Sequence, residues 1–115
     1  MGWNHPHLLR GRTALALLFA GPLCTFSVQA NLTEERQQAL HHMLLHDCGS
    51  CHGMTLQGGL GLPLTTEALA GKPAEFLFRT IRDGHPGTPM PPWKEILNEE
   101  EIYYLVDLLL RGAVQ

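Results

Sequence analysis

The hydrophobic and polar residues of the chain follow a helical period in three stretches beyond residue 30. In the clearest one, residues 98–112, the apolar positions recur at intervals of three and four and share one helix face: Ile102, Leu105, Val106, Leu109 and Leu110. Asn98 with Glu101 three residues later is typical of a capping box, and Gly112 suits the end of a helix. We therefore predict a helix over residues 98–112.

Two further helices follow from the same reasoning. Residues 33–47 open with acidic side chains, which a helix N-terminus favours, and carry an apolar face that leads into Cys48. Another helix begins near Pro73, a residue suited to the first helical position, and stops at Gly84. Residues 65–69 suit a short helical turn, and no segment alternates apolar and polar residues as a half-buried strand does. The expected fold class is all-α.

The segments between these helices are rich in glycine and proline. Residues 53–64 contain four glycines, so their backbone can turn tightly and approach a flat ligand closely. Residues 85–93 contain four prolines, which fix φ and can hold one side chain in place with little entropy lost on folding.

The first thirty residues are typical of a secretory signal peptide. They have a basic start, an eleven-residue apolar run over residues 13–23, and small residues before a cleavage point after Ala30. The run is shorter than the ~20 residues of a membrane-spanning helix, and an uncleaved membrane anchor is the alternative. We expect removal of residues 1–30, which would leave residues 31–115 as one periplasmic domain free of the membrane.

This domain would have 85 residues, with six basic and eleven acidic side chains and a net charge of −5. Such an acidic surface argues against nucleic acid and anionic membranes as partners. A chain this short gains little stability from apolar burial alone and needs an additional staple.

Residues 48–52, Cys-Gly-Ser-Cys-His, carry the most specific chemistry. C-x-x-C-H is the signature for covalent attachment of a c-type haem, in which two thiols add to vinyl groups and the imidazole binds the iron. Residues three apart are neighbours on a helical turn, so Cys48 and Cys51 face the same way and His52 can reach the metal. We expect one haem c, bound by thioethers of Cys48 and Cys51 with His52 as proximal iron ligand. This haem would be the staple that the domain needs.

Three other interpretations of the motif compete. A thioredoxin-like redox pair needs no following histidine and prefers a βαβ setting. A zinc site could take nitrogens from His42 and His46, but would leave His52 without a role. A structural disulfide would need only the two thiols. Separately, His41, His42 and His46 crowd the first helix, where a solvated face is the default and adventitious metal binding is a side hypothesis.

Met90, inside the proline-rich segment, is the expected distal iron ligand. Its thioether is neutral and soft, and it lies 38 residues after His52, far enough to reach the opposite face of the ring. His85 is the competitor and would give two histidine ligands and a lower reduction potential. Among haem contacts, Pro63 lies where a carbonyl could accept from the other ring N–H of His52. Trp93 could pack over the haem edge and donate its indole N–H to a propionate.

Together these features resemble the class I c-type cytochromes, over essentially all of residues 31–115. The helix running into the C-x-x-C-H motif, the loop Met90-Pro91-Pro92-Trp93 and the closing helix carry the resemblance. It implies a compact fold of three main helices in which the first and last cross beside one haem with an exposed edge. Within the class, residues 61–93 are similar to the small cytochromes of denitrification gene clusters, the c-fifty-five-X type.

The resemblance implies a monomeric periplasmic electron carrier, not an enzyme, whose redox partner is a periplasmic nitrite reductase containing haems c and d. The first alternative is an accessory role in maturation of the haem d of that reductase. The second is a haem enzyme or gas sensor, which requires a labile sixth ligand. The rigid proline-rich segment argues against a labile ligand.

Overall fold

The computed structural model describes residues 32–113, and the expected signal peptide therefore lies outside the described residues. Within them the chain forms helices and no strands, which confirms the all-α class. None of these helices is both long and apolar enough to span a bilayer. In chain order they are α1 (Glu34–Met43), η1 (Leu44–Cys48), α2 (Gly49–His52), α3 (Thr66–Leu69), α4 (Ala74–Asp83) and α5 (Glu99–Arg111).

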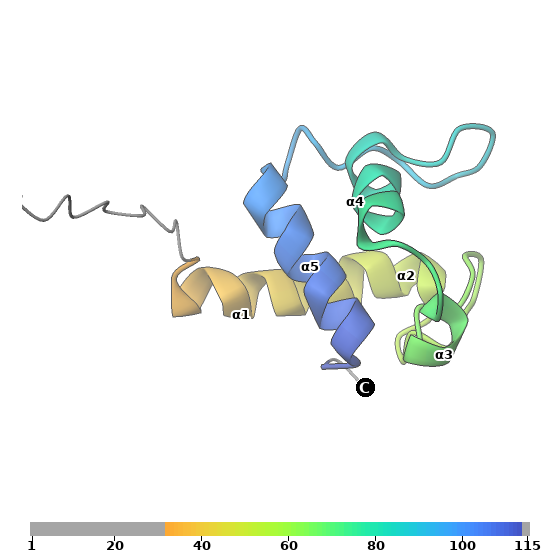
Figure 1. The fold of residues 1–115 in the computed structure, drawn as a ribbon, viewed down its shortest axis with the longest axis horizontal. Coiled ribbons are helices and arrows are strands. Elements are labelled where there is room, and N and C mark those ends of the chain that lie inside the picture. The colour runs from red at the N-terminus through yellow and green to blue at the C-terminus, as the bar shows by residue number, and fades with distance from the viewer. Residues whose placement is uncertain (1–31, 114–115) are drawn as a thin grey trace, which may run out of the picture.

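The first three elements form one continuous rod that runs into the C-x-x-C-H motif (Figure 1). Thr33 caps its start by accepting the Arg36 N–H at 3.2 Å. The sequence predicted an end near Asp47, but the rod continues to His52 because the π-helical turn η1 joins α1 to α2. Such turns are frequent at functional sites. The C-x-x-C-H motif thus lies on a helix, with Cys48 half-buried and Cys51 exposed.

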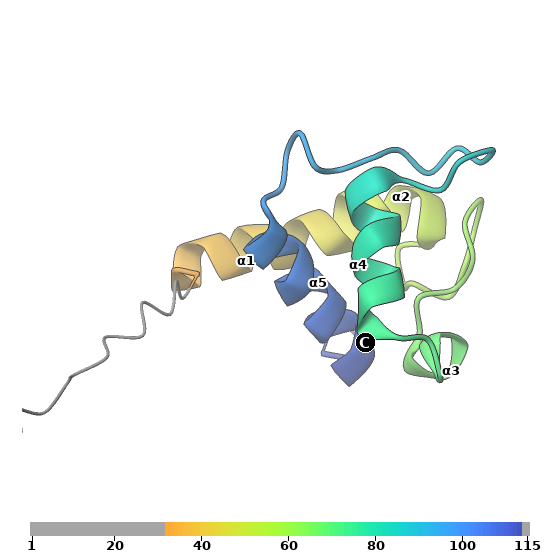
Figure 2. The same ribbon diagram turned by 45° about the horizontal axis from the view of Figure 1, so that its top comes forward.

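α5 crosses the rod, and α4 packs beside α5 (Figures 1 and 2). The predicted capping box is present: the Asn98 side chain accepts the Glu101 N–H at 2.9 Å, and the Glu101 carboxylate accepts the Asn98 N–H at 2.8 Å. The other oxygen of that carboxylate accepts from Arg36 of α1 at 2.6 Å, and so ties the two crossing helices together. Leu40 and Leu44 of the rod meet the apolar face of α5 in one buried core.

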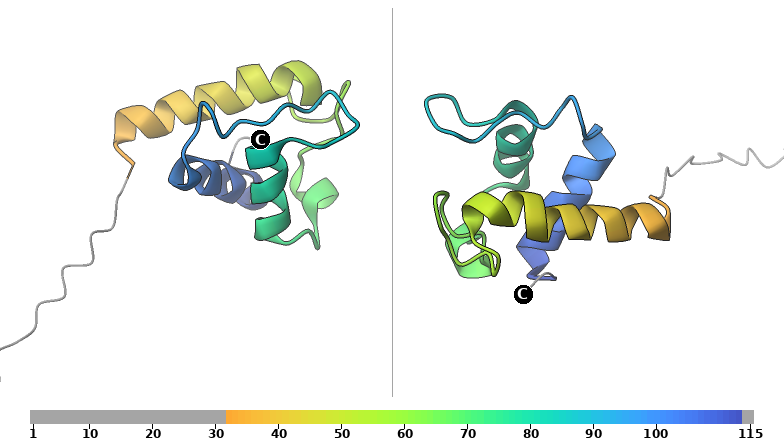
Figure 3. Two further views of the ribbon diagram at one scale, coloured as in Figure 1. Left: turned by 90° about the horizontal axis from the view of Figure 1, so that it is seen from above. Right: turned by 180° about the vertical axis from the view of Figure 1, so that it is seen from behind.

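The glycine-rich and proline-rich segments extend at the same end of the molecule, beyond α2 and α4 (Figures 1 and 3). The proline-rich segment leaves α4, reverses and returns beside its last turn, where the Trp93 N–H donates to the Ile81 carbonyl at 3.1 Å. The glycine-rich segment is anchored by Leu56, which is fully buried although its φ of 58° is unusual for a leucine. Each segment is therefore fixed to the helical core at one of these points, although many of its residues are exposed.

Candidate haem site

An apolar cavity opens between the rod, α4, α5 and the proline-rich segment. It brings together three of the predicted haem-binding residues that are far apart in the sequence: Cys48 and His52 from the rod, and Met90 from the proline-rich segment. Apart from these and Thr80, the lining is aliphatic; its further members are Leu44, Leu64, Leu77, Ile81, Leu105 and Leu109. The Thr80 hydroxyl donates to the Phe76 carbonyl within α4 at 2.8 Å. The cavity therefore offers apolar walls and very few polar atoms.

His52 is oriented by a hydrogen bond between its Nδ1 and the Leu62 carbonyl, at 2.7 Å. A carbonyl can only accept, so Nδ1 carries the proton and Nε2 keeps its lone pair for a metal ion. The expected acceptor was the Pro63 carbonyl, but in the structure it is the carbonyl of Leu62, the residue before. The reason is that the Gly61 N–H donates to the Cys51 carbonyl at 2.8 Å, which holds the backbone at Gly61 and Leu62 beside the ring.

Gly61 makes this arrangement possible. A Cβ atom at this position would lie 2.7 Å from both Cε1 and Nδ1 of His52, closer than real Cβ contacts occur. The backbone can therefore pass directly over the imidazole only because the residue is glycine. The sequence shows the glycine-rich segment but not this role, because nothing distinguishes the four glycines until the chain is folded.

The two cysteines are separate thiols in the described structure. Burial, and secondarily the charge of Asp47, raise the pKa of the Cys48 thiol to about 11, so the group is neutral at physiological pH. Nucleophilic redox chemistry requires a thiolate, so this position does not suit a reactive redox cysteine. In addition, no group of three or more His, Cys, Asp or Glu side chains that could hold a metal ion occurs among residues 32–113. A thioether, which carries no charge, suits this position of Cys48.

Met90 is presented to the cavity by a tightly bonded turn. The His85 N–H donates to the Met90 carbonyl at 3.2 Å, and the Met90 N–H donates to the Thr88 hydroxyl at 3.3 Å. Gly84 allows the close approach, since a Cβ there would lie 2.7 Å from the Met90 carbonyl oxygen. His85 is exposed and does not line the cavity. Of the two sixth-ligand candidates, the geometry favours Met90.

The remaining predicted haem contacts lie outside this lining. Pro63 packs near Gly58, and Trp93 is half-buried against the hydrophobic core. Their contacts with haem stay predictions. Cys51 is exposed at the end of the rod, one residue from His52. The residues present nevertheless fit a haem c: two thiols on one helical turn, an imidazole with a free Nε2, a soft thioether and aliphatic walls.

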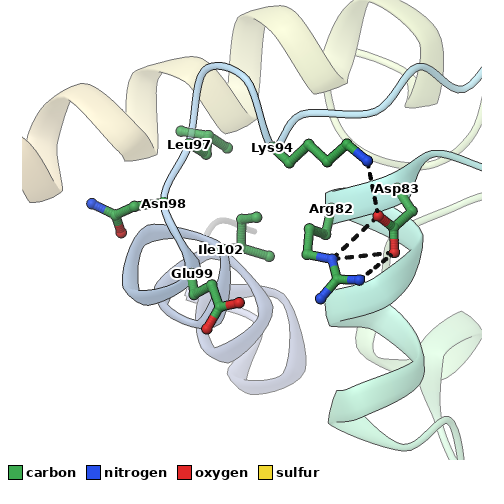
Figure 4. A pocket seen from close by; sticks show the side chains of 7 residues that line it. All are labelled: Arg82, Asp83, Lys94, Leu97, Asn98, Glu99 and Ile102. Carbon is green, nitrogen blue, oxygen red and sulfur yellow. Dashed lines mark hydrogen bonds and ion pairs between the residues drawn. The ribbon is translucent and has the colours of Figure 1, made fainter.

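A second hollow lies between the last turn of α4 and the start of α5 (Figure 4). Three of its four charged side chains already pair with one another: Asp83 accepts from Arg82 at 2.9 Å and from Lys94 at 3.6 Å. None of the predicted ligands lines it. We therefore place the functional site at the aliphatic cavity.

Comparison with known proteins defines the class. The family model described as cytochrome c oxidase, cbb3-type, subunit III matches residues 35–109. The chain therefore belongs to this family of c-type cytochromes, and covalently bound haem c is the cofactor that the family implies.

Individual relatives narrow the assignment. The chain is 52% identical to cytochrome c55X of Stutzerimonas stutzeri over 99 residues, which cover 86% of this chain and 85% of that protein. It is 52% identical to cytochrome c55X of Pseudomonas aeruginosa over 101 residues, or 88% and 84% of the two chains. A solved structure described as c-type cytochrome NirC is 52% identical, with a TM-score of 0.71 over 72% of this chain and 98% of its own. The resemblance found in the sequence is confirmed, and with it the electron-transfer function of a c-type cytochrome.

Proposed function

We propose that the protein is a periplasmic one-electron carrier with a single haem c, and that it donates electrons to a nitrite reductase containing haems c and d. The observation that carries the proposal is the meeting of Cys48, His52 and Met90 at one aliphatic cavity. When bound, haem c supplies a reversible one-electron change of its iron between the ferrous and ferric states.

The residues of this chain would tune that change in three ways. The Leu62 carbonyl holds the His52 ring in one tautomer and raises its basicity as a ligand. The Met90 thioether favours a higher reduction potential than a second imidazole would. The aliphatic walls exclude water from the cavity. Cys51, at the C-terminal end of the rod, is exposed, so a partner can approach the site from that side.

In this proposal the protein is not an enzyme, since His52 and Met90 would both bind the iron and leave it no open position for a substrate. A redox titration of the periplasmically expressed protein, followed by absorption spectroscopy, tests the site. We expect one haem per chain, resistance to extraction by acidified acetone, and the sulfur-to-iron charge-transfer band of methionine ligation in the oxidised state. Rapid binding of carbon monoxide or cyanide to the isolated protein would instead indicate a labile sixth ligand.

Deletion of the gene tests the partner and separates donation from maturation. If the protein is the donor, the reductase of the deletion strain contains both haems but is reduced slowly, and adding the reduced cytochrome restores turnover. A reductase that lacks haem d but retains haem c would contradict donation and favour the maturation role.

A further inference from the structure

Two histidines on the rod form a pair that the haem site does not use. His42 belongs to α1 and His46 to η1, four residues later. Their ring centroids are 4.1 Å apart and the ring planes are inclined by 32°. Both side chains are exposed, whereas Leu40 and Leu44 of the same rod face the core. The pair therefore lies on the surface and away from the haem cavity.

The nitrogens of the two rings are accessible. Two other polar side chains of α1 have partners, Arg36 with Glu101 and Gln37 with the Leu32 carbonyl. Among the hydrogen bonds between described residues, none involves the ring of His42 or His46. Two histidines at i and i+4 on one helix face are the arrangement by which helical metal sites bind zinc. Imidazole nitrogen is a good donor for zinc, copper and nickel.

We propose that His42 and His46 together chelate one divalent transition-metal ion, with water completing its coordination. The ion would be of the Zn²⁺, Ni²⁺ or Cu²⁺ class, and Cu²⁺ is bound most tightly because imidazole sites follow the Irving–Williams order. No third His, Cys, Asp or Glu side chain joins the two rings among the described residues, so the site is an exchangeable surface site and not a closed structural one.

The position of the pair gives the binding a structural consequence. The two ligands lie on either side of the junction between α1 and η1, at which the rod changes from α-helical to π-helical hydrogen bonding. An ion bound by both rings would stabilise the native backbone conformation at this junction. Because it binds the native state, it also raises the unfolding temperature of the protein. Metal binding by the pair does not depend on which protein is the electron-transfer partner.

Isothermal titration of the oxidised holoprotein, prepared without a polyhistidine tag, tests the site. Zn²⁺, Ni²⁺ and Cu²⁺ are titrated separately; the oxidised state keeps ferrous haem from reducing Cu²⁺. His42→Ala and His46→Ala are compared with His41→Ala, which removes a neighbouring histidine of the same helix but keeps the pair. Haem absorption spectra of all variants verify that each is folded and loaded.

We expect one ion per wild-type chain, and an affinity at least about tenfold weaker in each pair variant because a single imidazole remains. His41→Ala keeps the wild-type affinity. Zinc raises the unfolding temperature of the wild type and of His41→Ala, but not of the pair variants. Binding that is unchanged in either pair variant, binding lost equally in His41→Ala, or an absence of binding to the wild type would each overturn the proposal.

Discussion

Replacement of Gly61 by alanine is the most direct test of how the structure holds the imidazole of His52, the proposed iron ligand. The added Cβ would lie 2.7 Å from His52 Nδ1, whereas ordinary contacts begin at 3.4 Å, so ring and backbone must separate by about 0.7 Å. If the ring moves along the direction of its hydrogen bond, the 2.7 Å distance between Nδ1 and the Leu62 oxygen lengthens beyond the usual range of about 2.7–3.2 Å.

The expected cost has two parts. Forcing an extra methyl group into a packed position costs about 1–3 kcal/mol. Loss of the hydrogen bond removes about 1 kcal/mol more and makes the imidazole a less basic ligand. A less basic ligand stabilises ferric iron less, so the reduction potential of Gly61→Ala should rise.

Denaturant unfolding and a spectroelectrochemical titration measure the two effects. Gly49→Ala is the matched control: its Cβ would meet Met54 at an ordinary 3.5 Å, and alanine favours the helix. We expect wild-type stability or better, and an unchanged potential, in the control. A Gly61→Ala protein with wild-type stability and potential would refute the reasoning that this glycine sets the position of the His52 ring.

Three further predictions concern the distal ligand, the crossing helices and the glycine-rich segment. Met90→Ala should abolish the sulfur-to-iron charge-transfer band and lower the reduction potential, whereas His85→Ala should leave both unchanged; the opposite pattern would make His85 the ligand. The pKa of the Glu101 carboxyl lies below its ordinary value of 4.5, first because of the hydrogen bond from an arginine of α1. The ionised carboxylate therefore stabilises the protein fully at a pH above 4.5, and this stabilisation is lost as the pH falls through the lowered pKa. In acid, the unfolding free energy of Glu101→Gln should depend less on pH than that of the wild type. Equal pH dependence of the two proteins would contradict this. Leu56→Ala should destabilise the protein by about 2–5 kcal/mol in denaturant unfolding because the side chain is fully buried, while Leu60→Ala, at a position 75% exposed, should change it by less than about 0.5 kcal/mol.

Much of the helical structure could be predicted because its signals are local. The capping box of α5 needs only Asn98 and Glu101, and the apolar period needs only the neighbouring turns. The end of the first helix was predicted too early. A π-helical turn depends on how the rod packs, and no residue near Asp47 is a sequence signal that predicts it.

The features of the candidate site likewise divide into those that the sequence predicts and those that depend on tertiary packing. The sequence alone determined the class of cofactor and its candidate ligands. The reason is that the C-x-x-C-H motif and the methionine among prolines are recognisable from residue types and spacing. Folding decided that Leu62 and not Pro63 accepts from His52, that Gly61 must lack a side chain, and that Met90 and not His85 lines the cavity. These outcomes depend on backbone segments that approach within a few ångströms only after the helices have packed, and such distances are not encoded in the spacing of residues along the chain.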